Sequence, residues 1–515
     1  MQKKSDIVLI ILLILAALGI IDSAYLTYEH FAVDTTVTCG FGIFNECGRV
    51  LQSVYSVVYG IPLASFGFLY YSTLFIALVI LTFKESKLIK VLLILLTPAG
   101  ALISFYLIYL QFFILNALCL YCMLSAVISL SLFALVQIKY PKERVEMTSR
   151  FSRFLYINFL SKIIFLFQSD YIHEVMVSLG KFFGEKNWLK GIASFLFVYK
   201  NHSLRQNIAG IKFANPVGLA AGYDYDARLT RILPSFGFGF QSVGTVTNLP
   251  YEGNEPPRLG RLPKSRSLMV NKGFKNSGAK VIVEKLEKLN FTYPVGISIG
   301  KTNSLDIDTQ REGVKDIITV FELFENSKVE NAYYELNISC PNLKGKVSFY
   351  PLKNLDELLK AVDSLKIKKP IFIKMPIDKT DRETLAMLKV IAKHKVTGVI
   401  FGNLQKDRKN KHLVKSEVKK YKVGNFSGKP TFERSNELIS LCYKHFKNRL
   451  VIIGCGGIFS GLDAYTKIKR GARVVQFITA MIYEGPQIAA NINIELAELL
   501  KRDGYKNISQ AVGTV

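Results

Sequence analysis

The sequence of 515 residues predicts two fold classes in one chain: an all-α four-helix transmembrane bundle, then an α/β (β/α)8 barrel preceded by a helical extension. Two observations lead to this prediction. The first 140 residues contain long runs without any charged side chain, as membrane-spanning helices require. In the last part of the chain, short apolar runs alternate with helical stretches, which is typical of parallel β/α units.

The composition excludes several classes of protein. Hydrophobic residues make up 50% and charged residues 21% of the chain, which excludes a disordered or collagen-like protein. The net charge of +26, from 66 basic and 40 acidic residues, is compatible with nucleic-acid binding or with the cytoplasmic side of a membrane. Because no nucleic-acid motif accompanies the charge, we expect the membrane and no nucleic-acid partner.

Four membrane spans are expected before residue 140. Residues 7–26 contain one charged side chain, Asp22, and residues 60–83 contain none. Residues 91–138 also contain none, and they are long enough for two helices joined by a turn near residues 115–118. A cleaved signal peptide is the alternative for the first span, but three further spans follow and no small-residue cleavage site is visible.

The loops between the spans predict the orientation. Basic residues flank the start of the first span, the loop after the second and the exit from the fourth, namely Lys3, Lys4, Lys84, Lys87, Lys90, Lys139, Lys142 and Arg144. Since cytoplasmic loops carry the excess of Lys and Arg, these regions and everything after residue 139 should be cytoplasmic. The loop of about residues 29–59 and the third turn should face outward. The expected location is the cell (inner) membrane, with several spans.

Four cysteines gather on the predicted outward side. Cys39 and Cys47 lie in the outward loop, and Cys119 and Cys122 form a C-x-x-C at the outer end of the fourth span. A C-x-x-C on a helix can form a reversible disulfide whose N-terminal thiol is partly ionised. The two pairs predict a relay of electrons from an external dithiol to a lipid-soluble acceptor. Structural disulfides remain an alternative, as does zinc, although His30 is the one histidine nearby and no metal site is expected.

The segment of about residues 5–140 resembles the vitamin K epoxide reductase family. The resemblance is carried by Cys39-x7-Cys47, by GRVLQS at 48–53, by YGIPLA at 59–64 and by the C-x-x-C on the last helix. It implies a bundle that binds a quinone beside the C-x-x-C, with Cys122 contacting the quinone and Cys119 exchanging with the loop cysteines. Bacterial members reoxidise a thioredoxin-like protein, so an extracytoplasmic dithiol protein of that kind is an expected partner.

Residues 141–200 should connect the bundle, residues 1–140, to the barrel, residues 201–515. Residues 139–152 are polar and charged and predict a linker, and apolar and basic residues then recur to about residue 200, with a second helix around residues 172–182. Such amphipathic helices lie on a membrane surface or form a dimer contact. After a membrane anchor, docking on the membrane surface is favoured.

Eight strands are expected in the barrel part, at 216–222, 240–247, 295–300, 333–339, 371–376, 398–403, 451–457 and 474–479. Eight units in about 300 residues fit a closed (β/α)8 barrel better than an open Rossmann sheet. The carboxyl ends of barrel strands are where chemistry takes place. Polar and glycine residues collect at these ends: Asp224, Thr245, Ser298, Lys301, Asn337, Cys340, Asn342, Lys374, Asn403, Gly456, Gly457 and Thr479.

Some of these residues suit a flavin nucleotide. Gly456 and Gly457 after the seventh strand allow backbone amides to approach a phosphate, and Thr479 after the eighth adds a hydroxyl. Lys374 at the end of the fifth strand suits the anionic locus of a flavin ring, although a plain buried ion pair is the alternative.

Other residues suit the substrate. Four asparagines offer donors and acceptors for a planar imide-like ring with a carboxylate, namely Asn271, Asn337, Asn342 and Asn403. Cys340 follows the fourth strand in a loop held by a proline, where a thiol can act as a general base, with an inert cysteine as the alternative.

Residues of about 153–497 resemble the dihydroorotate dehydrogenase family, in its class 2, quinone-dependent branch. The resemblance is carried by NPVGLAAG at 215–222, GTVT at 244–247, EGNEPPR at 252–258, GFKN at 273–276, NISCPN at 337–342, SGKP at 427–430 and GCGG at 454–457. The helices of about 153–200 match the membrane-docking extension of that class.

This resemblance implies a site and a reaction. FMN would be held by Ala221, Gly222, Thr245, Ser298, Asn337, Lys374, Ser427, Gly428, Gly456, Gly457 and Thr479. Dihydroorotate would be held by Asn271, Asn337, Asn342 and Asn403. The base, Cys340, takes a proton from C5 while a hydride leaves C6 for the flavin, and a quinone that enters between the N-terminal helices then receives the electrons.

The sequence departs from the family pattern at five positions. Class 2 enzymes usually have serine at the position of Cys340. Class 1 enzymes have cysteine there, as this chain does. The lysine expected to contact flavin and substrate is Tyr225, and the asparagine expected after the third strand is Ser298. Gly402 and Ile478 replace a threonine and an aromatic residue. These changes put the substrate in doubt more than the FMN.

The sequence thus predicts a bifunctional membrane redox enzyme with both halves linked to quinone. The barrel would oxidise dihydroorotate to orotate in pyrimidine biosynthesis, and the bundle would oxidise external dithiols. The fusion would place both at the membrane without electron transfer between them. Two alternatives remain: an FMN oxidoreductase acting on another cyclic amide, or a degenerate barrel attached to a working disulfide-forming membrane domain.

Overall fold

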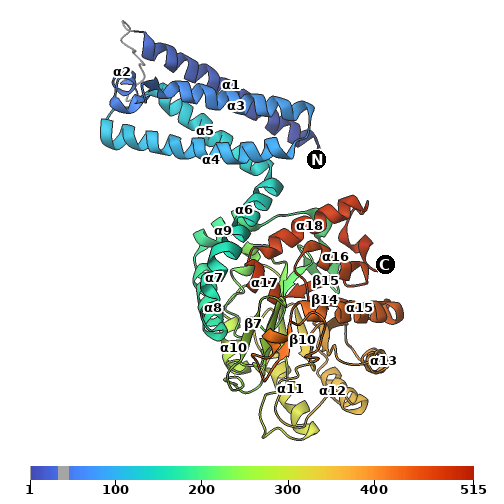
Figure 1. Ribbon diagram of the computed structural model, residues 1–515. Helices are drawn as coiled ribbons and strands as arrows, with labels where there is room; N and C mark the ends of the chain where they lie inside the picture. Colours follow the sequence, from blue (N-terminus) through green and yellow to red (C-terminus); the bar gives the residue numbers. More distant parts are fainter. Residues whose placement is uncertain (1, 33–43, 45) are drawn as a thin grey trace. The chain divides into compact units, whose positions relative to one another are not determined.

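The computed structural model describes residues 2–32, 44 and 46–515 (Figure 1). It consists of two compact units, Met1–Met147 and Thr148–Val515, which are described separately below. The boundary between them falls inside the segment that was expected to connect the two folds. The predicted loop cysteine Cys39 lies outside the described residues.

The first unit contains four long apolar helices: α1 (Gln2–Phe31), α3 (Leu63–Phe83), α4 (Lys87–Tyr109) and α5 (Leu120–Lys139). Helix α1 packs against α3 and α5, and α4 packs against α5. All four are long and apolar enough to cross a membrane. The predicted four-helix bundle is confirmed.

Two connections in this unit position its cysteines. Helix α4 continues into a π-helical turn, Leu110–Leu115, which ends at Asn116 in the left-handed conformation (φ 46°). This turn lies where the sequence predicts one, because an asparagine tolerates positive φ and ends the helix. Between α1 and α3 the described chain forms α2 (Cys47–Leu51), a 3-10 turn (Val54–Ser56) and a hairpin of β1 (Val57–Val58) and β2 (Ile61–Pro62).

A series of helices precedes the barrel. These are α6 (Pro141–Leu155), a π-helical turn (Tyr156–Leu160), α7 (Ser161–Ile164), α8 (Ser169–Glu185) and α9 (Asn187–Phe197). The segment 139–152, predicted as a linker, is therefore largely helical. Proline is well tolerated in the first turn of a helix, and Glu143 in that turn favours the helix dipole. The predicted second helix, 172–182, lies within α8.

The second unit is built on a closed barrel of eight parallel strands, in the order β10-β11-β12-β14-β15-β5-β6-β9. The strands are β5 (Val217–Leu219), β6 (Phe240–Val246), β9 (Val295–Ile299), β10 (Tyr333–Asn337), β11 (Ile371–Met375), β12 (Gly398–Phe401), β14 (Val451–Cys455) and β15 (Val474–Phe477). All eight predicted strands are confirmed. Each ends one to three residues earlier than predicted, because the polar residues at the carboxyl ends leave the ladder and form the loops of the site.

Helices surround the barrel, as Figure 1 shows. They are α10 (Ala279–Leu286), α11 (Gln310–Glu325), α12 (Leu352–Ser364), α13 (Asp381–Ile391), α14 (Lys415–Val418), α15 (Phe432–Phe446), α16 (Gly461–Lys469), α17 (Thr479–Glu484) and α18 (Ile488–Arg502). A small antiparallel sheet of order β13-β8-β7 is formed by β7 (Leu259–Leu262), β8 (Ser267–Val270) and β13 (Asn425–Phe426). A hairpin of β3 (Gln206–Ile208) and β4 (Ile211–Phe213) precedes the first barrel strand.

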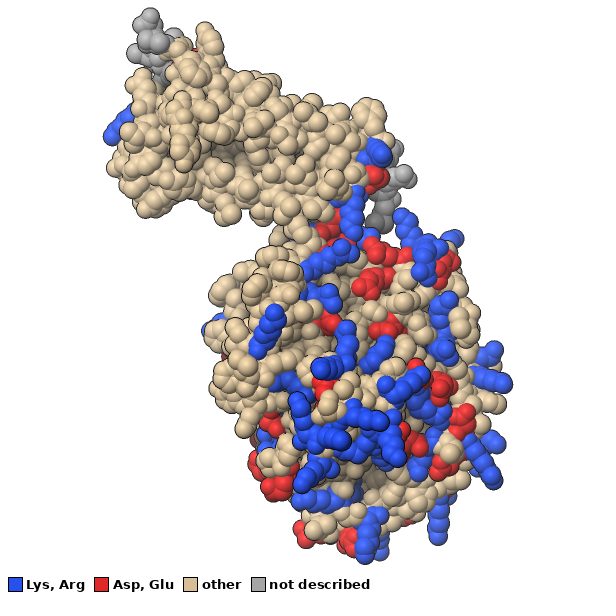
Figure 2. All heavy atoms as spheres, viewed as in Figure 1, with Lys and Arg blue, Asp and Glu red and all other residues tan. Residues whose placement is uncertain are grey.

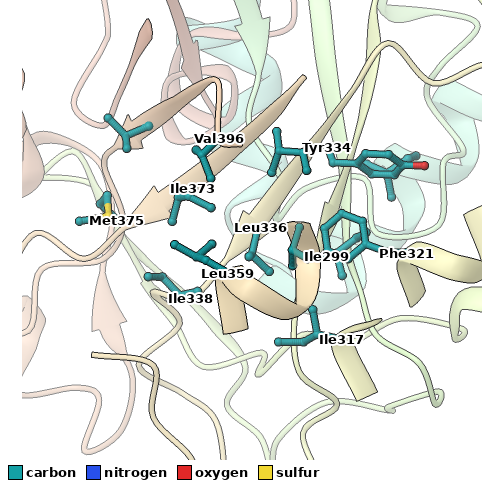
Figure 3. Packing of buried hydrophobic residues seen from close by; sticks show 14 of the residues in the cluster. Ile299, Ile317, Phe321, Tyr334, Leu336, Ile338, Leu359, Ile373, Met375 and Val396 are labelled. Atoms are coloured by element: carbon teal, nitrogen blue, oxygen red, sulfur yellow. The ribbon is translucent and has the colours of Figure 1, made fainter. Parts of the chain in front are cut away.

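The largest apolar core lies between the barrel strands and the surrounding helices. Leu336 of β10 and Ile373 of β11 belong to it, together with Ile317 and Phe321 of α11 and Leu359 of α12 (Figure 3). Burial of such side chains stabilises the fold by about 1.5–3 kcal/mol each. This core fixes the strands, and therefore the direction of the polar side chains at their ends.

The charged residues are distributed unevenly over the two units. On the face shown in Figure 2, Lys and Arg crowd the surface of the second unit, while the visible surface of the four-helix unit is largely uncharged. In the sequence, residues 1–147 contain nine basic and eight acidic residues, so the net charge of +26 belongs mainly to the barrel part of the chain.

Candidate functional site

Three of the four predicted relay cysteines lie together in the described part of the bundle. Cys47 and Cys119 are both 0% exposed and belong to one small apolar cluster with Val50 and Ala117, and Cys122 packs against this cluster. Cys47 is disulfide-bonded, whereas Cys119 and Cys122 are free thiols. The fourth, Cys39, lies outside the described residues. A loop cysteine and the C-x-x-C thus meet in one buried place.

Cys119 occupies a position that favours its thiolate. It caps the N-terminus of α5, and its Sγ accepts the backbone N–H of Cys122 at 3.4 Å. Its own backbone N–H donates to Gln111 Oε1 at 3.0 Å, which fixes the loop that carries it. A thiol at a helix N-terminus is the more nucleophilic partner of a C-x-x-C pair because its thiolate is stabilised there.

A cavity of about 390 Å³ lies inside the bundle, and Cys122 is part of its wall. Most of the lining is apolar, with a few polar groups among it, including His30, Gln111 and Tyr71. The Tyr71 hydroxyl donates to the Ser125 carbonyl oxygen at 2.8 Å. A flat apolar ring that carries a few hydrogen-bond acceptors suits such a cavity. The cavity and the relay cysteines therefore share one residue, Cys122.

In the barrel, a buried chain of polar groups links four neighbouring strands. Asn337 Nδ2 donates to Thr245 Oγ1 at 3.0 Å, and Thr245 Oγ1 lies 3.0 Å from Ser298 Oγ. Ser298 Oγ donates to Glu335 Oε1 at 3.2 Å, and Lys374 Nζ contacts the same carboxylate oxygen at 3.2 Å. Burial by itself lowers the pKa of Lys374, but the Glu335 carboxylate outweighs it, so the pKa is raised and the side chain is cationic.

The backbone around two glycines forms a cradle at the ends of β14 and β15. Gly456 and Gly457 have φ of 91° and 72°, and an added Cβ would lie 2.5 Å from Thr431 Oγ1 and from Phe432 Cβ respectively. Nearby, Ser427 Oγ and Thr479 Oγ1 are 2.8 Å apart. Close backbone approach combined with hydroxyl groups, after the seventh and eighth strands of a barrel, is the usual arrangement for a phosphate group. The residues fit the phosphate of a flavin nucleotide.

Two of the predicted asparagines line the barrel cavity from the loops. Asn403 Nδ2 donates to the Ser339 carbonyl oxygen at 2.8 Å, and Asn342 Nδ2 donates to the Val270 carbonyl oxygen at 3.0 Å. Both side chains are therefore held in fixed orientations and retain further donor or acceptor capacity for a ligand.

Cys340 also lies on the wall of this cavity. In the sequence it stands between the end of β10 and Asn342. The protein surrounding it raises the pKa of its thiol to about 11, against smaller opposing contributions from the Asn342 backbone, Lys374 and Lys406. At neutral pH the group is therefore mostly a thiol. Only the small fraction in the thiolate form can accept a proton.

One cavity at the carboxyl ends of the strands brings most of the predicted barrel residues together. They are Ala221, Gly222, Thr245, Asn337, Cys340, Asn342, Lys374, Asn403, Ser427, Gly428, Gly456, Gly457 and Thr479. Of the described residues that were predicted for this site, Ser298 and Asn271 lie off its wall. Ser298 stands behind Thr245 in the polar chain, and Asn271 contacts Asn254, whose amide also donates to Asn342.

Sequence reasoning did not single out Lys272, His173 and Phe274, which also lie on the cavity wall. Lys272 and Phe274 belong to the loop after β8, and His173 comes from α8. Lys272 stands directly after Asn271, at the end of an apolar run, and that position was the available signal. No local pattern could have placed His173 here, because α8 reaches the cavity through tertiary packing against β7.

Two sequence models of protein families match the chain. The one described as Dihydroorotate dehydrogenase matches residues 203–500, and the one described as Vitamin K epoxide reductase family matches residues 10–137. The first match alone covers more than half of the chain.

Individual proteins are similar as well. The chain is 36% identical over 330 residues to a dihydroorotate dehydrogenase (quinone) of Trichodesmium erythraeum, which covers 62% of this chain and 85% of that protein. It is 35% identical over 352 residues to a protein of the same name from Christiangramia forsetii, which covers 67% and 99%. The crystal structure of the Eimeria tenella enzyme in complex with ferulenol is similar with a TM-score of 0.56 and 28% identity, covering 66% of this chain and 95% of that one.

Proposed function

The chain belongs to the dihydroorotate dehydrogenase family and carries a vitamin K epoxide reductase family domain ahead of that part; from this premise we propose a membrane-bound oxidoreductase with two quinone-linked sites. The barrel oxidises dihydroorotate to orotate with FMN, and the bundle oxidises dithiols to disulfides. The single observation that carries the proposal is the convergence of the glycine cradle, Lys374, the asparagines and Cys340 on one cavity.

The barrel residues support binding of FMN. The cradle of Gly456 and Gly457, with Ser427 and Thr479, would hold the phosphate, and Lys374 would face the anionic side of the ring. When bound, FMN supplies the acceptor for a hydride from C6 of the substrate. Glu335 keeps Lys374 charged and in place, so the cation does not depend on the ligand for its position.

Substrate chemistry falls to the loop residues. Asn337, Asn342 and Asn403 would orient the imide ring through paired donors and acceptors. Cys340 would take the proton from C5, so that the substrate loses one proton to the thiolate and one hydride to the acceptor, which together make the double bond of orotate. Because burial raises the pKa of Cys340, this step would become faster as pH rises.

The bundle supports thiol oxidation by quinone. A loop dithiol would reduce a Cys119–Cys122 disulfide by exchange at Cys119, and the two thiols so formed would pass two electrons and two protons to a quinone, which leaves as quinol. The geometry supports this order, since Cys119 shares a cluster with Cys47 while Cys122 lines the cavity. An extracytoplasmic thioredoxin-like dithiol protein is the proposed source of electrons.

The helices ahead of the barrel support docking on the cytoplasmic face of the inner membrane. They expose large apolar side chains, among them Phe154, Phe159, Ile163, Phe182, Trp188 and Ile192. Exposed apolar patches of this kind mark protein or membrane contacts. A quinone dissolved in the membrane would enter the barrel site between these helices, and the four spans of the bundle would keep the chain in the same membrane.

The experiment is the anaerobic addition of dihydroorotate to the purified full-length protein while flavin absorbance is followed. We expect a yellow protein whose flavin absorbance decreases on addition and returns with quinone. A yellow protein that does not respond would favour the second candidate, an FMN oxidoreductase for another cyclic amide. That candidate is favoured by one observation, the buried Tyr225 on the cavity wall where a lysine was expected. A colourless protein would contradict both and favour a barrel without catalysis.

A further inference from the structure

Lys272 places a buried positive charge on the wall of the barrel cavity. The residue follows β8, is 3% exposed and lines the same cavity as Asn337, Cys340 and Asn342. Burying an ammonium lowers the stability of the fold unless the group is paired or hydrogen-bonded. The groups around Lys272 therefore indicate whether its charge is used within the protein or is available to a ligand.

The contacts of Lys272 within the protein are long. Its Nζ lies 3.6 Å from Asp170 Oδ1 and 3.4 Å from His173 Nδ1, both on α8. Charge-assisted hydrogen bonds are typically about 2.7–2.9 Å long. The two longer contacts of Lys272 therefore position its ammonium but leave its hydrogen-bonding capacity incompletely used. Asp170 is also engaged elsewhere, because its other oxygen accepts the backbone N–H of Leu259 at 3.2 Å.

His173 is held as a neutral acceptor toward Lys272. Burial lowers the pKa of His173, and its Nε2 lies 2.8 Å from the carbonyl oxygen of Tyr223, to which only a protonated Nε2 can donate. Its Nδ1 therefore carries the lone pair that faces Lys272. The neutral histidine therefore adds no second positive charge beside the ammonium.

The second lysine in the described lining has a closer carboxylate partner than Lys272. Lys374 Nζ lies 3.2 Å from Glu335, whose side chain is 0% exposed, whereas Lys272 Nζ lies 3.6 Å from Asp170. Of the two described lysines on the cavity wall, Lys272 therefore has the longer carboxylate contact and the greater capacity to bind an entering anion.

Tyr225 shows how the cavity accommodates this cation. The phenol ring is buried on the same wall, and Lys272 Nζ lies 4.9 Å from the ring centroid, within the range of a cation–π contact. The aromatic face stabilises the ammonium without accepting a directed N–H hydrogen bond, so the ammonium keeps donor capacity for a further acceptor. The loop after β5 thus brings Tyr225 to the cavity, where the family pattern has a lysine. The loop after β8 brings a different lysine, Lys272, to the same cavity.

We propose that Lys272 is a substrate-binding residue whose ammonium binds the carboxylate of the anionic cyclic imide, taking the place that Tyr225 leaves without a cation. This inference rests on the proposed function of the barrel. The loop that carries Lys272 is fixed to the substrate side of the cavity, because Asn342 Nδ2 donates to the carbonyl oxygen of Val270, two residues before it.

The test compares ligands with and without the carboxylate. Binding of orotate and of uracil, which lacks only that group, is measured by perturbation of the flavin spectrum and by equilibrium dialysis, on the wild type and on Lys272→Met and Lys272→Arg. Wild type should bind orotate more tightly than uracil. Lys272→Met should weaken orotate by about 10- to 100-fold, as expected for loss of a charge-assisted contact, and leave uracil unchanged. Lys272→Arg, which keeps the charge, should retain part of the preference.

A matched control is available three residues away. Lys275 has a side chain 30% exposed, pairs with Glu174 at 3.6 Å and is not among the residues that form the cavity wall in the described structure. Lys275→Met removes a positive charge from the same loop and should leave orotate binding unchanged. Equal loss in both variants would overturn the proposal, because it would mean a general effect of charge.

A measurement on the wild type alone keeps the proposal testable if the variants do not fold. Burial lowers the pKa of Lys272 to about 8, opposed by Asp170 and Glu174 and assisted by Lys275, with His173 and Tyr225 also facing it. Orotate affinity should therefore fall as pH rises through about 8, while uracil affinity in the same range should not.

The outcomes separate this proposal from the function on which it rests. Orotate that binds wild type tightly and Lys272→Met equally tightly overturns the role of Lys272 and leaves the proposed function standing. Wild type that retains flavin but binds no orotate overturns both. A wild-type orotate affinity that stays constant across the titration of Lys272 also overturns the role of Lys272.

Discussion

The side chains of Cys47 and Cys119 are both fully buried and pack in one small apolar cluster, although Cys47 follows the first helix of the bundle and Cys119 precedes the last. Exchange between Cys47 and the C-x-x-C therefore requires no long movement of the chain. Cys122 packs against this cluster and also lies on the wall of the cavity. The arrangement separates the thiol that would exchange from the thiol that would meet the acceptor.

Replacing Cys122 by serine should trap the exchange intermediate. Without Cys122, Cys119 can attack the loop disulfide, and the mixed disulfide can then revert only through the freed loop thiol and cannot go on to a Cys119–Cys122 disulfide, so the mixed disulfide should accumulate. Peptide mass spectrometry after alkylation measures it. Cys119→Ser is the control and should give no such species. If Cys122→Ser and Cys119→Ser give the same peptides, the assigned order of the two thiols is wrong.

The barrel reaction should accelerate with pH if Cys340 is the base. The pKa of the thiol is raised to about 11, so its thiolate form increases about tenfold for each pH unit below that value. The rate of absorbance loss with saturating dihydroorotate, measured by stopped flow, should rise accordingly. Cys340→Ala should lower the rate by about 100- to 10 000-fold without loss of flavin. A rate that is independent of pH in wild type would contradict a thiolate base.

The contribution of Lys374 to stability should be separable from its contribution to the reaction by comparing a single with a double variant. Lys374→Met alone leaves the buried Glu335 without its cation and should cost about 3–5 kcal/mol in the free energy of unfolding. The double variant Lys374→Met/Glu335→Leu should recover most of that stability in thermal unfolding. It should still not bleach with dihydroorotate, because no cation faces the ring. Recovery of bleaching in the double variant would show that the lysine serves only the fold.

The glycine cradle should be sensitive to a single methyl group. Gly456→Ala combines strain at φ 91° with a Cβ 2.5 Å from Thr431 Oγ1, and the flavin content of the purified protein should fall. Gly504 is the matched control, since it has φ 79° with no atom within 4 Å of an added Cβ. Gly504→Ala should cost about 1–2 kcal/mol of strain alone and keep its flavin. Equal flavin content in both variants would argue against a phosphate at Gly456.

The barrel could be predicted from the sequence because its strands are buried on both faces. Segments such as 333–339 and 371–376 appear as short apolar runs between helical stretches, and this pattern needs no knowledge of tertiary contacts. The carboxyl ends of the strands then bring Thr245, Asn337 and Lys374 together by topology alone. The position of Cys122 beside the bundle cavity likewise agrees with the family resemblance, although its role remains a prediction.

The rest depends on packing that no local pattern encodes. The burial of Lys272 could not be predicted from its place directly after Asn271, since this burial arises from α8 and from the ring of Tyr225. In the sequence, nothing distinguishes Asn271 from the other three predicted asparagines. In the structure its side chain accepts from Asn254, and it is not part of the cavity wall. The charged segment 139–152 was predicted as a linker because its composition is polar, yet its spacing and Pro141 at the first turn are compatible with helix α6.

The most direct test of two independent sites in one chain is quinone reduction by a single preparation with two donors, dihydroorotate and a small dithiol. The account predicts that Cys340→Ala abolishes reduction by dihydroorotate and spares reduction by the dithiol, and that Cys122→Ser does the reverse. Loss of both activities in either variant, or a wild type that uses only one donor, would contradict it.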